Sequence, residues 1–355
     1  MHKRDTSSGP QSPQRRRLLK TAASMAAAGG LLASAGWLVI KRKQNLFEVR
    51  RERTLMQTSV AVTCLADDVA AAGVAIEAAF ERMAATAALL TRFDPASPLS
   101  RLNRDGHLAQ VPATLREVLQ QALALSTLTD GAFDVSVLPA LRYLESLRKP
   151  VALSARERSE LGAMDHLIGY RGIELGAQDV RLVHPGMSIT LDGIAKGHVV
   201  DQGIAALRSC GIEYGLIDAG GDIQSICGAD PERHWNVGIV NPQNINEVSA
   251  IVQLRNAALS TSGNYRVFFS ADRRLFHIID PHTGSSPESY SSVTVMTDRS
   301  ILADGMSTAA FSLELPRLKH LMAVHNRQWL VFSRTGAQRW RSRDLPLIAG
   351  TAEIA

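Results

Sequence analysis

The sequence has few cysteines, and their spacing excludes a zinc cluster and a disulfide framework. The chain of 355 residues contains 3 cysteines, Cys64, Cys210 and Cys227, and none lies at the spacing that metal ligands adopt. An odd number is also unsuited to a framework of disulfides. We therefore predict that the cysteines are buried as small apolar side chains, with one Cys210–Cys227 bridge in an oxidising compartment as the alternative.

Aromatic residues are also scarce, and the basic residues are unevenly distributed. Aromatics make up 5% of the chain, and the Arg and Lys residues that give the net charge of +5 crowd into the first 53 positions. They occur there at residues 15–17, 41–43 and 50–51. The remainder has no basic stripe studded with aromatics, so we exclude nucleic acid as a partner.

The chain has no internal repeat and no low-complexity tract beyond its first residues. Its length is sufficient for one large domain with an ample core. Apolar spacing predicts a half-buried strand over 59–65, helices over 67–90 and 114–129, short strands with Gly-rich turns from 188 to 295, a helix within them near 198–209, and a helix over 304–313. This order predicts an α+β fold in which strands outnumber crossover helices in the second half.

The N-terminus is predicted to be an export signal. Residues 15–20 are Arg-Arg-Arg-Leu-Leu-Lys, which resembles the twin-arginine signal of bacterial export. An apolar run over 21–40 follows and contains Ala33-Ser34-Ala35, a small-x-small cleavage pattern. Because about 20 apolar residues can span a bilayer, a retained membrane anchor is the alternative to cleavage. We expect residues 1–54 to lie outside the fold and residues 55–355 to form one domain.

Two motifs near the C-terminal end point to a metal site that handles phosphate. In Asp304-Gly305-Met306-Ser307-Thr308 a carboxylate and a hydroxyl are four residues apart, so on a helix both oxygens share one face. Mg²⁺ accepts protein oxygens of this kind and takes its other ligands from water and phosphates. The motif over 277–284 is typical of a strand that runs into a tight turn. The structural alternative is that Asp304 caps a helix and that 277–284 is a surface turn.

Four further segments combine small residues with polar groups. Residues 129–134 place Gly131 at the end of a helix, where it can act as a C-cap. Residues 189–197 place Lys196 at a helix start, where backbone amides and a lysine can hold a phosphate, although the glycine spacing of a P-loop is missing. Residues 218–222 form a Gly-Gly turn, and residues 260–265 form a hydroxyl cluster. A bare turn or cap explains any one of them alone.

The order of these motifs resembles the ApbE family, the FAD:protein FMN transferases. The matching segments are 93–103, with an aromatic, Pro-x-Ser and Asn; 131–134, Gly-Ala-Phe-Asp; 193–197, Gly-Ile-Ala-Lys-Gly, with Asp201 downstream; 220–222, Gly-Gly-Asp; 261–265, Thr-Ser-Gly-Asn-Tyr; 277–284, His-Ile-Ile-Asp-Pro-His-Thr-Gly; and 304–308. There are two departures. Thr190 replaces an acid usual in the family, with Asp192 nearby, and Phe93 replaces a common tyrosine, which keeps the stacking surface.

The resemblance implies a single ApbE-like domain with an FAD cleft, and a reaction that needs FAD and Mg²⁺. In the family, FMN is transferred from FAD to a threonine hydroxyl of a partner flavoprotein, and AMP leaves. The implied metal ligands are the Asp304 carboxylate, the Thr308 hydroxyl and the Ala195 carbonyl. His277 is the expected general base, with Asp304 as the alternative. The implied cofactor contacts are Met56, Phe93, Ala132, Phe133, Asp134, Thr190, Asp192, Lys196 and Ile278.

The same residues suit two other functions. A Mg²⁺-dependent FAD pyrophosphatase would release free FMN and AMP, and a non-catalytic periplasmic carrier would only bind flavin. The intact Asp304 and Thr308 pair argues against the carrier, because storage of FAD needs no metal ligands. The export signal predicts a periplasmic location, with anchoring through residues 21–40 as the alternative. Among transferases, an exported member resembles those that accompany nitrous-oxide respiration and modify a membrane-bound flavoprotein.

Overall fold

A computed structural model of the chain describes residues 38–43, 46–147 and 153–348. All of them belong to one compact unit, Gly36–Ala355. The twin-arginine motif over 15–20 and the candidate cleavage site at 33–35 lie outside the described residues. Within the described ranges, no helix has the length and apolar character needed to cross a membrane.

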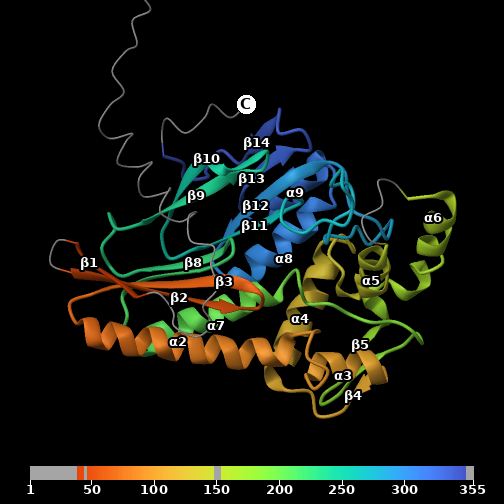
Figure 1. The fold of residues 1–355 in the computed structure, drawn as a ribbon, viewed down its shortest axis with the longest axis horizontal. Coiled ribbons are helices and arrows are strands. Elements are labelled where there is room, and N and C mark those ends of the chain that lie inside the picture. The colour runs from red at the N-terminus through yellow and green to blue at the C-terminus, as the bar shows by residue number, and fades with distance from the viewer. Residues whose placement is uncertain (1–37, 44–45, 148–152, 349–355) are drawn as a thin grey trace, which may run out of the picture. The chain divides into compact units, whose positions relative to one another are not determined.

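A nine-stranded antiparallel sheet is the centre of the fold (Figure 1). Its spatial order is β1-β2-β3-β7-β8-β11-β12-β13-β14. The bounds are β1 Leu38–Lys43, β2 Leu46–Leu55, β3 Thr58–Ala66, β7 Tyr214–Ala219, β8 Asp222–Cys227, β11 Ala258–Gly263, β12 Tyr290–Thr297, β13 Gln328–Ser333 and β14 Arg339–Arg341. Two smaller sheets pair β9 (Trp235–Asn241) with β10 (Asn244–Leu254), and β4 (His107–Leu108) with β6 (Val180–Leu182) and β5 (Ile173–Leu175).

Alternate residues of the large sheet enter two different cores. On β13, Val331 packs in the main core with the helices, whereas its neighbours Leu330 and Phe332 pack with the β9–β10 hairpin. The sheet is therefore covered on both faces, and consecutive residues of its central strands are buried. The predicted strand over 59–65 is confirmed as β3, but Val60 to Leu65 are buried on both faces and not on one alone.

The helices are α2 (Val69–Leu90), α3 (Pro98–Asp105), α4 (Ala113–Leu128), α5 (Leu138–Ser146), α6 (Ala155–Gly162), α7 (Ala195–Ser209), α8 (Ser300–Phe311) and α9 (Leu315–Val324). The predicted helices over 67–90 and 114–129 are confirmed as α2 and α4. Helix α2 runs alongside β2 and β3 and packs against α7 (Figure 1). Helix α7 starts at Ala195, three residues before the predicted range of 198–209, and Lys196 lies in its first turn, as predicted for a lysine at a helix start.

Helices α7 and α8 approach closely, and this contact positions the candidate site. A Cβ atom on Gly197 would lie 2.3 Å from the Ser300 carbonyl oxygen, so only glycine fits there. The Asp201 carboxylate accepts hydrogen bonds from the Ser300 amide at 2.7 Å and the Ile301 amide at 3.2 Å, and so caps α8 from α7. The alternative that Asp304 caps this helix is wrong, because α8 begins four residues earlier, at Ser300, and Asp304 lies inside it.

The expectation that residues before Leu55 lie outside the fold differs from the structure. Strand β2 pairs with β3 from Phe47 opposite Ala66 to Leu55 opposite Thr58. Strand β1 extends the same sheet. The charges of this segment conceal the strand pattern, but they are accommodated at the surface, where Arg51 and Arg53 both pair with Glu77 of α2.

The prediction that the cysteines are buried is confirmed for two of them and is wrong for Cys210, which lies just after the end of α7. Cys64 and Cys227 are buried, Cys210 is exposed, and all three are free thiols. The alternative Cys210–Cys227 bridge is therefore absent. Burial, followed by the nearby Cys210, raises the pKa of Cys64 to about 12, which keeps that thiol protonated and unreactive.

Candidate active site

Lys196, Asp222 and Asp304 form a charged cluster where α7, β8 and α8 meet. The Lys196 ammonium forms a salt bridge with the Asp222 carboxylate, whose other oxygen accepts a hydrogen bond from the Ser260 hydroxyl. Asp222 is the first residue of β8, and Ser260 lies opposite it on β11. Burial opposes the charge of Lys196, but Asp222 and Asp304 outweigh that effect and raise its pKa. The lysine therefore remains a fixed cation at neutral pH.

Asp304 is a buried carboxylate with too little positive charge around it. It is 3% exposed, and its Oδ2 atom accepts a hydrogen bond from the Gly197 amide at 3.0 Å. Burial, and then the charge of Asp222, raise its pKa from 3.8 to about 7, although Lys196 and the Gly197 amide oppose the shift. An additional cation at this carboxylate would relieve both effects.

Thr308 places a second oxygen one helical turn beyond Asp304. Its Oγ1 atom lies 3.4 Å from the Gly193 carbonyl oxygen, to which it donates, and 3.3 Å from the Ser262 hydroxyl. A Cβ atom on Gly193 would lie only 3.0 Å from this hydroxyl. Glycine at 193 therefore lets the loop before α7 approach α8. Ala195 follows in the same loop–helix junction, where its amide donates to the Leu191 carbonyl at 2.8 Å.

The donor atoms of this cluster suit a hard cation. Within the described ranges, no group of three or more His, Cys, Asp or Glu side chains is placed to hold a metal ion. The expected set is of another kind, because it combines one carboxylate with a hydroxyl and a backbone carbonyl. Oxygen donors with so few protein charges fit Mg²⁺, which keeps several positions for water and phosphate.

His277 lies within electrostatic reach of this cluster. Burial lowers the pKa of its imidazole, and the charge of Lys196 adds to this effect. Its Nδ1 atom lies 3.1 Å from the Val267 carbonyl oxygen. Since a carbonyl can only accept, Nδ1 carries the proton of the neutral ring, and Nε2 keeps a free lone pair. The ring is therefore prepared to accept a proton at Nε2.

Phe93 and Asp192 are joined by an arginine that the sequence analysis did not single out. Phe93 is 59% exposed, and the guanidinium of Arg92 lies 4.3 Å from the centre of its ring. Arg92 also pairs with Asp192 at 2.8 Å and with Glu145 at 3.0 Å. An exposed aromatic that is held on one face presents the other face for stacking. Thr190 is buried, and its hydroxyl accepts from the Asp192 amide at 3.2 Å.

Most of the remaining residues that we expected to contact the cofactor lie in or against the main core. Ala132, Phe133 and Ile278 are buried in the main core. Asp134 is 7% exposed and accepts from the Ser136 amide and hydroxyl and from the Tyr170 amide, so its carboxylate orders the surrounding loops. Met56 occupies the turn between β2 and β3 with a φ of 51°, partly packed against the core.

Three charged residues of the site had no assigned role in the sequence analysis. Asp222 stands in the Gly-Gly-Asp segment, and a carboxylate directly after a glycine turn is the signal that could have identified it. Arg92 and Arg266 are single cations in loops and carry no such signal. Their relation to the site depends on which chain segments meet.

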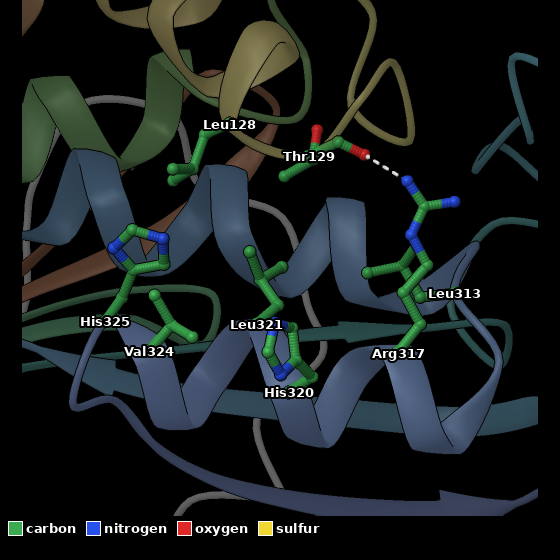
Figure 2. Close-up of a pocket in the computed structure, with 8 residues that line it drawn as sticks. All are labelled: Leu128, Thr129, Leu313, Arg317, His320, Leu321, Val324 and His325. Carbon is green, nitrogen blue, oxygen red and sulfur yellow. Dashed lines mark hydrogen bonds between the residues drawn. The ribbon is translucent and has the colours of Figure 1, made fainter.

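A separate groove of about 220 Å³ lies between the end of α4 and α9 (Figure 2). Its lining combines apolar residues with one arginine and two histidines, and Arg317 donates to the Thr129 carbonyl. None of the expected site residues lines it. We therefore assign the site by the chemistry of its residues and not by this groove.

Comparisons with known proteins identify the family of the chain. The sequence profile of the ApbE family matches residues 56–331. A Haemophilus influenzae protein named FAD:protein FMN transferase is 28% identical over 239 residues, covering 64% of this chain and 68% of its own. A Treponema pallidum protein of the same name is 31% identical over 238 residues, covering 61% and 65%. The crystal structure of the ApbE protein of Thermotoga maritima superposes with a TM-score of 0.75 at 25% identity, over 84% of this chain and 97% of its own. Because the profile matches most of its length, the chain belongs to the ApbE family.

Proposed function

We propose that this protein transfers FMN from FAD to a partner protein. The family and the names of the similar proteins support this activity. The observation that carries the proposal is the cluster of Lys196, Asp304 and Thr308 beside His277. A fixed cation, a carboxylate that lacks positive charge and a neutral imidazole are the groups that phosphoryl transfer requires for positioning and charge neutralisation.

We further propose that Asp304, Thr308 and the Ala195 carbonyl hold Mg²⁺. The raised pKa of Asp304, caused by burial and Asp222, supports this, because a bound cation would favour the ionised form. When bound, Mg²⁺ would neutralise charge on the pyrophosphate oxygens. Lys196 contributes a fixed positive charge from the start of α7, and Phe93 offers a surface on which a ring of FAD stacks.

In the proposed reaction, a threonine hydroxyl of the acceptor attacks the phosphorus of the FMN half of FAD. The new bond joins the threonine Oγ to that phosphorus, and the bond from the phosphorus to the bridging oxygen breaks, so that AMP leaves. His277 accepts the hydroxyl proton at Nε2. Asp304 is less suited to be the base, because the same oxygens would hold the cation.

A product assay tests the proposal. Purified protein, FAD and Mg²⁺ are incubated with and without a flavoprotein acceptor, and the acceptor is examined for covalent FMN by mass. We expect covalent FMN and AMP only when the acceptor is present, and no transfer in excess chelator. Free FMN and AMP without an acceptor would identify a pyrophosphatase, and binding of FAD with no product would identify a carrier.

The location of the protein is a separate proposal. We propose export by the twin-arginine pathway and an acceptor flavoprotein at the periplasmic side of a membrane, on the basis of residues 15–20. Leu38 and Ile40 belong to β1, which pairs with β2. A strand residue of the sheet cannot also lie in a bilayer, so the apolar run left for a membrane span is 21–37. This is at the lower limit of about 17 residues for a spanning helix, which favours cleavage over anchoring.

A further inference from the structure

Arg266 occupies the same sheet edge as the charged cluster, although it comes from a different loop. It lies three residues beyond Gly263, where β11 ends, and its Nη1 atom donates to the Gly220 carbonyl oxygen at 2.9 Å. Gly220 and Gly221 form the turn that leads directly into Asp222, the partner of Lys196. The guanidinium is therefore anchored one turn away from the salt bridge at the centre of the site.

The two glycines keep this place open for the guanidinium. Gly220 and Gly221 have φ angles of 69° and 104°, which side chains rarely adopt. A Cβ atom on Gly220 would also lie 2.4 Å from the Thr58 hydroxyl and 3.5 Å from Nη1 of Arg266. Thr58 begins β3, two residues after Met56. The turn thus brings Arg266 beside the segment that carries an expected flavin contact.

The positive charge of Arg266 has no carboxylate partner within the described part of the chain, where no Asp or Glu oxygen lies within 4.0 Å of it. Asp218, the acid of the same turn, accepts from the Gly221 amide at 3.0 Å. Burial raises the pKa of Asp218, and the charge of Arg266 opposes this shift from beyond 4.0 Å. Lys196, by contrast, is matched by Asp222. The Gly220–Gly221 turn that holds Arg266 leads directly into Asp222, so the two cations lie on the same side of the site. Exposed donors beside a second cation form a site for an anion.

We propose that Arg266 binds the pyrophosphate of FAD and shares its negative charge with Lys196. A guanidinium presents a planar fork of donors that matches phosphate oxygens, whereas Lys196 supplies a point charge. This inference rests on the proposed function, because it takes FAD to be the ligand. The alternatives are that Arg266 only fastens the Gly220–Gly221 turn, or that it contacts the acceptor protein.

The test compares Arg266→Gln and Arg266→Lys with Arg274→Gln, which removes the same charge from an exposed position of the same loop. Affinity for FAD is measured by flavin fluorescence with Mg²⁺, and the melting temperature is measured without ligand. We expect Arg266→Gln to weaken FAD binding roughly ten- to a hundredfold, because a charged hydrogen bond is lost, with an unchanged melting temperature. Arg266→Lys should keep the charge and lose part of the affinity, and Arg274→Gln should bind as wild type.

Three results would overturn the inference. Wild-type FAD affinity in Arg266→Gln would remove the pyrophosphate contact. A lowered melting temperature with parallel loss of affinity in both Arg266 variants would indicate a structural fastener. Unchanged FAD affinity with a raised KM for the acceptor would assign Arg266 to the acceptor interface. Failure of the proposed function is distinct, because the wild-type protein itself would then bind no FAD or transfer no FMN.

Discussion

Replacement of Asp304 by asparagine should separate the charge of this residue from its shape. Asparagine keeps the size of the side chain and an oxygen that can accept from the Gly197 amide. It removes the negative charge that burial and Asp222 disfavour. At neutral pH without metal, the variant should therefore be relieved of an electrostatic cost that wild type carries.

The size of this cost follows from the pKa of Asp304, which is raised from 3.8 to about 7. Because the folded pKa of Asp304 exceeds the unfolded value, the contribution of this carboxyl group to the free energy of unfolding is fully present below the unfolded pKa. It is lost as pH rises through the folded pKa, since the folded protein then has to hold the buried charge. One pKa unit corresponds to about 1.4 kcal/mol, so the shift has a ceiling of about 4 kcal/mol. Of this, about 2–3 kcal/mol should be lost between pH 5 and pH 8.

The assay is denaturant unfolding of wild type and Asp304→Asn in excess chelator across this pH range. The difference in free energy of unfolding should grow in favour of the variant by about 2–3 kcal/mol from pH 5 to pH 8. Asp67→Asn changes an exposed carboxylate and is the control, whose difference from wild type should stay constant. Added Mg²⁺ should stabilise wild type at pH 8 and leave Asp304→Asn unchanged, and FMN transfer by the variant should fall by orders of magnitude.

Parallel stability curves for wild type and Asp304→Asn would refute this reasoning, because they would mean that the Asp304 carboxylate experiences no net electrostatic cost in the fold. Stabilisation of the variant by Mg²⁺ equal to that of wild type would separately remove Asp304 from the metal site.

Three further predictions concern the base, the stacking surface and export. His277→Ala should keep FAD affinity and slow FMN transfer by about 10²–10⁴-fold, with partial rescue at high pH. Because burial lowers the His277 pKa, the wild-type rate should decline only below about pH 6.5, and a wild-type rate in the variant would exclude this base. Phe93→Ala should weaken FAD binding about tenfold without loss of stability, since the ring is 59% exposed, and Phe93→Tyr should retain affinity. Lysine at both Arg15 and Arg16 should leave the precursor in the cytoplasm by fractionation, and normal periplasmic accumulation would contradict the export proposal.

The sequence by itself determined the family and most of the local structure. The order of small-residue motifs from 93 to 308 predicted the ApbE fold, and the helices α2 and α4 followed from apolar spacing. The positions of Asp304 and Thr308 one helical turn apart required only helical geometry. These features depend on neighbouring residues or on the order of motifs along the chain, so they can be predicted from the sequence alone.

Other features depended on contacts between distant segments. Strand β2 was concealed by its charges, because Glu77, which pairs with Arg51 and Arg53, lies on α2. The cap of α8 comes from Asp201 of α7, and the partner of Lys196 is Asp222 of β8. Neither pairing has a sequence signal. Only the tertiary structure decides these two pairings. A charge interacts with the groups that the fold brings within a few ångströms, even when those groups are far away along the chain.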